Sequence, residues 1–238
     1  MLVDARRARA LVAPPQHAPE SAGEAFAVQD HVLRELGPAG GWKVGAKTPA
    51  EEPVAAPILA DHCRPSPCTW PAADFHVRIV EAEIAFRIGR DIPADGPAIT
   101  RDALIDLVSG IHAAIEIVDS RLEGYPNVDK LWMLADNQSN GGFVFCPDGV
   151  PWTGQDYDTA DVRLTIDGTL RVEGPQPNTG GDPARLVVWC LDHLRGRGGV
   201  RAGTWITTGS YTGMIPVGPG ARVEAEFPGI GRVSLDLP

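Results

Sequence analysis

Apolar and charged side chains alternate from Arg78 to Ile88, in the order Arg-Ile-Val-Glu-Ala-Glu-Ile-Ala-Phe-Arg-Ile. This alternation predicts a β-strand, because successive side chains of a strand point to opposite faces. Glu81 and Glu83 then share one face, with their Cα atoms about 7 Å apart at a rise of roughly 3.3 Å per residue. We therefore expect a strand with one apolar face and two neighbouring carboxylates on the other.

A second apolar run, Ile111–Asp119, predicts a buried strand that also contains a glutamate. By alternation, Glu116 lies on the face opposite the isoleucines. A charged group is seldom fully buried without a partner, so Glu116 is expected to face a cation. At the end of this strand, Asp119 and Arg121 are expected to form an ordinary ion pair.

Helical periodicity is confined to short segments whose ends carry recognisable signals. Ser21 and Glu24 have the spacing of a capping box, and the apolar stripe that follows ends at Gly37. Helices are likewise predicted for Leu2–Val12, after Thr100, for Leu131–Asp136 and from Asp182 to Gly196. Strands are predicted for Gly40–Lys47, for Phe143–Cys146, for a hairpin at Val162–Val172 that turns at Asp167-Gly168, and for three or more segments from Thr204 to Leu237. Much of the chain is therefore expected to be β.

The segment Thr48–Pro71 contains six prolines and has little periodicity. The pattern predicts a loop rather than a helix or strand. Loops of this length inside a compact domain are often lids over a functional site, although plain surface is the alternative. We expect the segment to close over a bound ligand.

Length and charge narrow the class of protein. The 238 residues suffice for one mixed or all-β domain, or for two small ones. The 31 acidic and 21 basic residues give a net charge of −10, which argues against a nucleic-acid or anionic-membrane partner and favours a small-molecule ligand. No apolar run approaches the roughly 18 residues that span a bilayer, and the N-terminus has no apolar secretory segment. We expect a cytoplasmic protein.

The two carboxylates on the strand Arg78–Ile88 predict either a metal site or an exposed surface. Carboxylates this close repel unless a cation lies between them, and hard divalent cations bind oxygen ligands. The sequence Val-Glu-Ala-Glu occurs a second time at Val223–Glu226, where we expect a solvated strand face. The pattern alone does not distinguish the two copies, so other residues must decide.

Cysteines offer a weaker candidate for a metal site. Cys63 and Cys68, together with His62, could bind zinc, but no second ligand pair lies at a suitable spacing. Four cysteines are few for this length, and in a reducing compartment they are expected to stay thiols.

The order of these segments resembles the fumarylacetoacetate hydrolase superfamily, and within it the branch of 2-keto-4-pentenoate hydratases and 4-oxalocrotonate decarboxylases. Five ordered motifs, which run through most of the chain, carry the resemblance. They are Gly41-Trp-Lys-Val-Gly45, Val80-Glu-Ala-Glu-Ile-Ala-Phe86, Ile115-Glu-Ile-Val-Asp-Ser-Arg121, Asp136-Asn-Gln-Ser139 and Thr207-Thr-Gly-Ser-Tyr-Thr212. Five motifs in order are far more specific than any one of them.

The resemblance implies an α+β fold with a mixed β-roll, or barrel-like core, similar to the C-terminal domain of fumarylacetoacetate hydrolase. We divide the chain into an N-terminal helical region, residues 1–40, and a β-rich metal-binding catalytic domain, residues 41–238. The resemblance also implies a homo-oligomer and a magnesium or manganese ion held by Glu81, Glu83 and Glu116.

One departure from the branch concerns an aspartate. Its hydratases carry a Pro-Asp-aromatic-Gly motif downstream of the lysine, whereas the corresponding stretch here, Glu51–Leu59, has no aspartate. If that aspartate assists proton transfer, this chain either catalyses a related reaction or draws on Glu51, Glu52 or Asp61.

The resemblance favours a metal-dependent lyase that acts on a 2-oxo or 2-hydroxydienoate acid. The leading hypothesis is hydration of 2-hydroxypenta-2,4-dienoate to 4-hydroxy-2-oxopentanoate, a reaction of aromatic catabolism. Decarboxylation of 4-oxalocrotonate and C–C hydrolysis of an acylpyruvate share an enolate intermediate and stay open as alternatives. A catalytically silent metal- or ligand-binding domain is an alternative of another class.

Lys43 is the expected proton donor or oxyanion stabiliser. Burial and a nearby metal ion both lower the pKa of a lysine towards working pH, which suits this role. The alternative is that Lys43 only neutralises the glutamates. By resemblance alone, Asn137 and Ser210 are expected to position the substrate.

Overall fold

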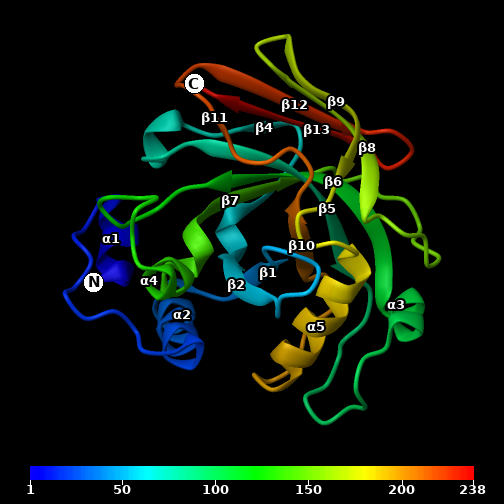
Figure 1. Ribbon diagram of the computed structural model, residues 1–238, viewed down its shortest axis with the longest axis horizontal. Helices are drawn as coiled ribbons and strands as arrows, with labels where there is room; N and C mark the ends of the chain where they lie inside the picture. The colour runs from blue at the N-terminus through cyan, green and yellow to red at the C-terminus, as the bar shows by residue number, and fades with distance from the viewer.

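The computed structural model describes residues 1–238 and places two β-sheets against each other, with helices along the larger sheet (Figure 1). The strands of the larger sheet are β1 (Ala39–Gly45), β2 (Val54–Leu59), β3 (Cys63–Pro65), β5 (Ile79–Ile88), β6 (Val108–Val118), β7 (Asn140–Phe145), β10 (Trp205–Ser210) and β11 (Ile215–Pro216). They lie in the order β2-β1-β10-β5-β6-β7-β3, and β11 pairs with β5. The pairs β1–β10 and β3–β7 are parallel, so the sheet is mixed.

The smaller sheet has the strand order β4-β13-β12-β8-β9. Its strands are β4 (Cys68–Thr69), β8 (Thr159–Ile166), β9 (Thr169–Pro177), β12 (Ala221–Phe227) and β13 (Gly231–Leu237). The hairpin β8–β9 turns at Asp167 and Gly168, with φ angles of 51° and 72°. Two positive φ angles are what a two-residue type I′ turn requires, and Asp-Gly supplies them at little cost. The predicted hairpin is confirmed.

The structure has five α-helices, and three of them begin at capping residues that the sequence analysis identified. The five are α1 (Leu2–Ala8), α2 (Ala22–Leu36), α3 (Arg101–Leu107), α4 (Lys130–Ala135) and α5 (Pro183–Arg195). The side chains of Ser21, Thr100 and Asp182 each accept a hydrogen bond from a backbone N–H in the first turn of α2, α3 and α5. Helix α1 is shorter than predicted, because Arg9 adopts a left-handed conformation with φ 49° and ends it. None of the helices combines the length and the apolar character needed to cross a bilayer.

The larger sheet curls into an open roll. Its edge strand β2 contacts β7, which lies near the opposite edge, although no strand pairing joins the two. Helix α5 packs on β1 and β10, and α2 packs on β2 and α4. The expected α+β class and roll-like core are confirmed. The boundary at residue 40 stays a prediction.

The strand β5 separates two different environments. Val80, Ala82, Ile84 and Phe86 are fully buried in the main core, together with side chains of β12 and β13. The opposite face, which carries the glutamates, looks into the roll, where Ala85 packs with Trp205 and other side chains of a small apolar cluster. The alternation of the sequence therefore assigns each face of β5 correctly.

The prediction of a loop or lid for the segment Thr48–Pro71 is wrong. It contains β2, whose residues after Val54 are buried, and the short strands β3 and β4. The prolines were the reason for the wrong prediction. A proline is tolerated in an edge strand, because its missing N–H removes no hydrogen bond between strands there. Pro57 lies in such a strand, at the end of the larger sheet.

The second Val-Glu-Ala-Glu sequence lies on the partly exposed face of β12. Glu224 pairs with Arg222 at 3.2 Å, and Glu226 pairs with Arg232 at 2.8 Å. Both glutamates thus have an arginine partner on a partly exposed strand face, as expected for this copy.

Candidate functional site

Three glutamates meet inside the roll because of the register between β5 and β6. Glu81 lies directly opposite Glu116, and Glu83 follows two residues later on the same face of β5. One carboxylate oxygen from each lies within 4.8 Å of the other two. Glu83 and Glu116 are at most 1% exposed, whereas Glu81 is half-buried. We refer to Glu81, Glu83 and Glu116 as the glutamate cluster.

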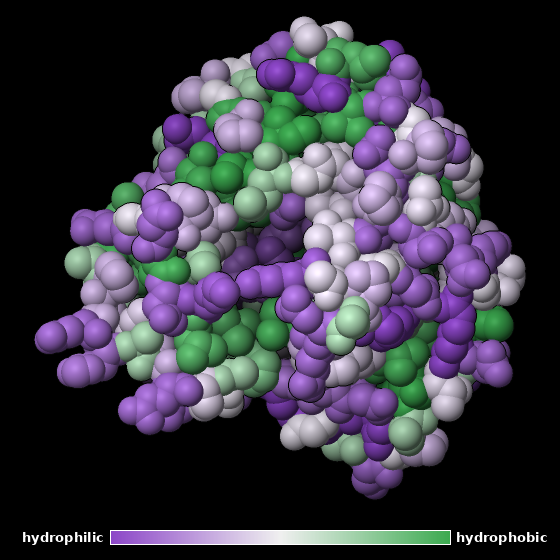
Figure 2. All heavy atoms as spheres, in the orientation of Figure 1, coloured by the Kyte–Doolittle hydropathy of each residue, from purple (hydrophilic) through white to green (hydrophobic).

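The curl of the sheet brings Lys43 to this cluster. Its Nζ donates to Glu116 Oε1 at 2.6 Å and to the carbonyl oxygen of Gln138 at 3.2 Å. Three strand spacings separate β1 from β6, or roughly 14 Å in a flat sheet, which exceeds the reach of a lysine side chain. Figure 2 shows a hollow lined by hydrophilic atoms in the region between β1 and β7 of Figure 1.

The strand β10 supplies hydrogen bonds to Glu83. The hydroxyl of Thr207 and the backbone N–H of Gly209, the latter at 3.1 Å, both donate to Glu83 Oε2. The pairing of β10 with β5 is irregular between Thr207 and Ser210, and Gly209 has a φ of 87°. Because glycine adopts this conformation without strain, the bulge can direct both donors at one carboxylate oxygen.

A tight turn covers the other side of the cluster. Asn137, Gln138 and Ser139 form a single 3-10 turn in which all three residues have φ between 50° and 56°. The turn presents the Gln138 carbonyl to Lys43, and the next residue, Asn140, donates to Glu116 Oε1 at 2.9 Å. Three consecutive non-glycine residues with positive φ are unfavourable, so surrounding contacts must hold the turn.

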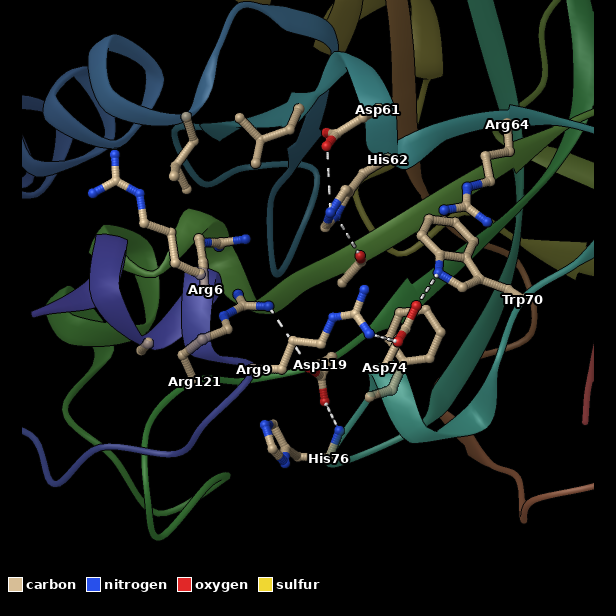
Figure 3. A pocket seen from close by; sticks show the side chains of 16 residues that line it. Arg6, Arg9, Asp61, His62, Arg64, Trp70, Asp74, His76, Asp119 and Arg121 are labelled. Carbon is tan, nitrogen blue, oxygen red and sulfur yellow. Dashed lines mark hydrogen bonds and ion pairs between the residues drawn. The ribbon is translucent and has the colours of Figure 1, made fainter.

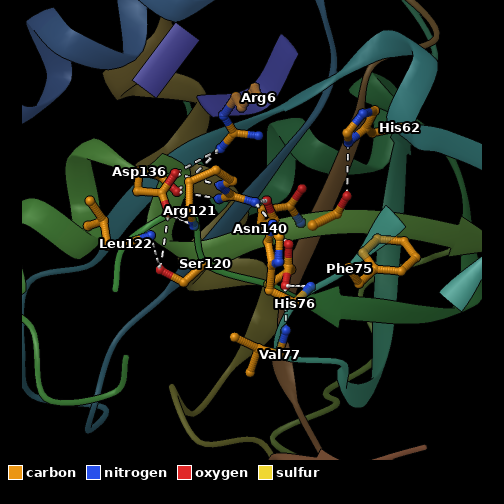
Figure 4. Close-up of polar contacts among 12 residues, drawn as sticks. Arg6, His62, Phe75, His76, Val77, Ser120, Arg121, Leu122, Asp136 and Asn140 are labelled. Carbon is orange, nitrogen blue, oxygen red and sulfur yellow. Dashed lines mark hydrogen bonds and ion pairs between the residues drawn. The ribbon is translucent and has the colours of Figure 1, made fainter. Parts of the chain in front are cut away.

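The buried carboxylate of Asp136 anchors this turn (Figure 4). Arg121 Nε donates to Asp136 Oδ1 at 2.7 Å, and Arg121 Nη1 donates to the carbonyl of Asn140 at 2.8 Å. Arg6 from α1 reaches the same carboxylate at 3.3 Å. The sequence predicted an ion pair between Asp119 and Arg121, which is present at 3.8 Å, but Asp136 is the closer partner.

The carboxylates raise one another's pKa values. Burial and the charges of Glu116 and Glu81 hold the pKa of Glu83 well above its usual 4.5. Burial and Glu116 also raise the pKa of Glu81, against the opposing effects of Lys43 and Ser210. Burial alone lowers the pKa of Lys43, but the three glutamates together outweigh it and raise that pKa. This direction is opposite to the one the sequence suggested for a lysine beside a bound cation.

The glutamate cluster fits a divalent cation. When all three carboxylates are ionised, they leave two negative charges against the Lys43 ammonium group in a largely buried space. Two ionised carboxylates repel by about 3 kcal/mol or more when their oxygens lie within 4.8 Å, at an effective dielectric constant of about 20. Glu116 Oε2 is buried and has no hydrogen-bond partner, so one acceptor stays free for an ion. Hard oxygen donors of this kind suit magnesium or manganese rather than softer ions.

Of the residues proposed for substrate binding, Ser210 lies next to the cluster, and Asn137 lies in the turn whose Gln138 carbonyl bonds Lys43. Asn137 is 1% exposed and its Oδ1 has no hydrogen-bond partner. Ser210, opposite Glu83, accepts from the Thr212 N–H at 3.2 Å. The roles of both residues stay predictions.

Several residues at the site were not singled out from the sequence as ligands or donors. Thr207 and Gly209 lie in a quoted motif, but only the bulge in β10 shows that they bond Glu83. Asn140 belonged to a polar turn that turn chemistry alone explained. Tyr125 is half-buried, and burial raises its pKa, with Lys43 opposing and Glu81 adding to the effect; no pattern in the sequence indicated this residue.

None of the acidic residues considered as replacements for the missing aspartate is buried beside the cluster. Glu51 and Glu52 are exposed at the start of β2. Asp61 is exposed and lines a different pocket, on the α1 side of the sheet. The strand β2 itself carries only apolar side chains and one proline.

A profile of the family described as fumarylacetoacetate (FAA) hydrolase C-terminal matches residues 50–237. The chain belongs to this family. The match covers the smaller sheet, all of the larger sheet except β1, and all three glutamates of the cluster. The family expected from the sequence motifs is thereby confirmed.

Individual relatives lie in the hydratase and decarboxylase branch. The chain is 31% identical, over 170 residues, to 2-keto-4-pentenoate hydratase from Paraburkholderia xenovorans (strain LB400), covering 71% of this chain and 62% of the relative. It is 28% identical to 4-oxalocrotonate decarboxylase from Pseudomonas sp. (strain CF600), covering 65% of this chain and 58% of the relative. The chain therefore spans about three fifths of the length of these curated relatives.

The fold is that of a solved decarboxylase. The structure of 4-oxalocrotonate decarboxylase from Pseudomonas putida G7, complexed with magnesium and adipate, superposes with a TM-score of 0.82 at 22% identity. The superposition covers 100% of this chain and 94% of that one. At this identity the likeness shows the fold.

The raised pKa of Glu83 predicts how the stability of the metal-free protein depends on pH. The folded state keeps a proton on Glu83 that the unfolded state loses near pH 4.5, so this contribution to the free energy of unfolding falls as the pH rises through the folded pKa. Urea unfolding between about pH 5 and pH 8 should show the fall in the wild type, and Glu83→Gln should reduce it. The exposed control Glu224→Gln should leave the slope unchanged. An equal slope in wild type and Glu83→Gln would contradict the assignment.

Proposed function

We propose that this chain is a metal-dependent lyase that acts on a 2-oxo or 2-hydroxydienoate acid. The reaction that we favour is hydration of 2-hydroxypenta-2,4-dienoate to 4-hydroxy-2-oxopentanoate. The observation that carries the proposal is a glutamate cluster, with a lysine bonded to it, inside the roll of a chain 31% identical to a hydratase. A small-molecule acid is the proposed substrate, and assembly into a homo-oligomer stays a prediction.

Glu81, Glu83 and Glu116 are the residues that would hold magnesium or manganese. Such an ion would supply Lewis acidity towards the carboxylate and keto oxygens of a 2-oxo acid. The protein fixes two of these carboxylates before binding, because Thr207 and Gly209 donate hydrogen bonds to Glu83 and Asn140 donates one to Glu116. These donors act as the outer partners that orient ligand groups in metal sites.

Lys43 is the residue that we propose as proton donor or oxyanion stabiliser. An ammonium group has three N–H donors, and two of those on Lys43 are used by Glu116 and the Gln138 carbonyl. The third is free for a substrate oxygen or for the carbon that receives a proton. The neighbouring carboxylates raise the pKa of Lys43 and so keep it protonated, as a donor must be.

Asn137 and Ser210 are proposed to position the substrate from opposite sides of the cluster. The free Oδ1 of Asn137 is buried and can accept a hydrogen bond from a substrate hydroxyl. The Ser210 side chain lies against Glu81 at the end of β10, where it can contact the acid group of the substrate.

Decarboxylation of 4-oxalocrotonate is the second candidate function. The absence of a carboxylate on β2 favours it, because the chain then lacks the acidic residue expected of a hydratase at this position. A decarboxylase forms the same enolate by loss of carbon dioxide and still needs the lysine to deliver a proton.

Turnover assays separate these functions. Purified protein supplied with magnesium should convert 2-hydroxypenta-2,4-dienoate to 4-hydroxy-2-oxopentanoate, as followed by NMR of the product. Removal of metal by chelation should abolish turnover, and magnesium or manganese should restore it, whereas zinc should not. Release of carbon dioxide from 4-oxalocrotonate without hydration of the dienoate would favour the second candidate. Binding of the dienoate without turnover of either acid would indicate a catalytically silent domain and contradict both.

Lys43→Met tests whether the lysine is catalytic or only neutralises the cluster. Loss of a positioned proton donor should lower kcat by roughly 10²- to 10⁴-fold. Magnesium affinity, measured by calorimetry, should stay equal or increase, because the substitution removes a cation that repels the ion. A change in kcat of less than about tenfold, on the same Brønsted argument, would assign Lys43 a neutralising role.

A further inference from the structure

A pocket of about 320 Å³ lies on the α1 side of the larger sheet (Figure 3). It is bordered by α1 and the residue that ends it, by β3, and by the segment that leads into β5. We call it the arginine pocket, after five of the side chains that line it, namely Arg6, Arg7, Arg9, Arg64 and Arg121. Its volume is at the lower end of the range for small-molecule sites.

The arginine pocket is separate from the glutamate cluster. None of the three glutamates, nor Lys43, lines it. The pairing of β6 with β7 is irregular between Ile117 and Val118, so the residues of β7 beyond that point change faces. Asn140 therefore bonds Glu116 inside the roll, while the Gly141 carbonyl accepts from His62 Nδ1 in the pocket.

The acidic side chains of the pocket are already partnered or exposed. Asp74 pairs with Arg9 at 2.5 Å and accepts from the indole N–H of Trp70. Asp119 Oδ1 accepts two backbone N–H groups, from His76 and Val77, both at 2.7 Å. Asp61 is 76% exposed, beside His62 at the rim. Five arginines line the pocket against three aspartates, and two carboxylates outside the lining, Asp136 and Glu35, pair with Arg6, Arg121 and Arg7.

Arg64 has no carboxylate partner. It forms no ion pair, and its guanidinium group lies over the ring of Trp70 at 3.7 Å from the centroid. Stacking on an aromatic ring fixes the plane of a guanidinium and leaves its N–H groups directed outward along the edges. Arg64 is thus held in a defined position with donors that no anion of the chain uses.

Arg6 also lacks a carboxylate partner of its own. It shares the Asp136 carboxylate with Arg121, and its own Nε is buried without a hydrogen-bond partner. Burial and the nearby charge of Arg121 lower the pKa of Arg6 to about 9. Arg6 and Arg121 share the Asp136 carboxylate, and Asp119 lies 3.8 Å from Arg121 alone, so a further anion would stabilise the two guanidinium groups.

We propose that the arginine pocket binds a small polyanion, a dicarboxylate or a phosphate, between Arg64 on one side and Arg6 and Arg9 on the other. Guanidinium forks match the planar or tetrahedral oxygens of these groups, and each charge-assisted bond in a part-buried pocket contributes to affinity. Trp70 and Phe75 supply an apolar wall for the carbon chain of a dicarboxylate.

Calorimetric titration of the metal-free full chain tests the proposal with two probes, succinate and inorganic phosphate, at constant ionic strength. At least one should bind saturably, and the two arms show whether the pocket prefers carboxylate or phosphate. Arg64→Ala should weaken that binding by about tenfold or more, as expected for the loss of a charge-assisted hydrogen bond. Arg64→Lys, which keeps the charge but loses the stacked fork, should give an intermediate affinity.

Two matched variants complete the experiment. Arg163→Ala removes an exposed arginine on β8, which pairs only with Glu173, and should bind the probe as the wild type does. Lys43→Met should also leave the affinity unchanged. The proposal is overturned if neither probe binds saturably, if Arg64→Ala and Arg64→Lys both bind like the wild type, or if binding is lost in Lys43→Met.

Discussion

Repulsion among three carboxylates, two of them fully buried, is the constraint on which the rest of this structure depends. The register of β5 and β6 forces Glu81 opposite Glu116, and burial within the roll removes the water that would screen them. The surrounding elements each compensate part of this cost. The curl of the sheet brings Lys43 across to Glu116, the bulge in β10 directs donors at Glu83, and the turn before β7 adds an amide. With all three carboxylates ionised, two negative charges are left over, which a divalent cation held by the cluster would neutralise.

The strained turn links this site to the N-terminal helix. Asp136, at the start of the turn, is held by Arg121 from the end of β6 and by Arg6 from α1. Helix α1 therefore supports the residues that position Lys43 and Asn140, although it lies outside the roll. The same arginines border the pocket on the α1 side, so one buried network lies between the glutamate cluster and the arginine pocket.

Local sequence signals predicted most elements of the fold, but not the arrangement that curls the sheet. Side-chain alternation assigned both faces of β5, and Asp167-Gly168 marked the hairpin, because these signals act between near neighbours. The segment that contains β2 was wrongly predicted to be a loop. Its prolines argued against a strand, but Pro57 lies in an edge strand, where the missing N–H breaks no hydrogen bond of the sheet. The alternation of side chains did not predict the contact between Lys43 and the glutamates. That contact depends on the curvature of the sheet across three strand spacings, which is a property of the whole sheet. Only the family motifs suggested that contact.

The measurement that tests the account most directly compares the two copies of Val-Glu-Ala-Glu by magnesium calorimetry. Glu81→Gln keeps the shape of the side chain but removes one charge from the cluster. Its magnesium affinity should fall by about 10- to 100-fold or more, since even outer partners of metal ligands have effects of that size. Glu224→Gln, which changes a glutamate paired with Arg222 at the surface, should leave the affinity unchanged. Equal losses in both variants, or a loss in neither, would contradict the assignment of the metal site to β5 and β6.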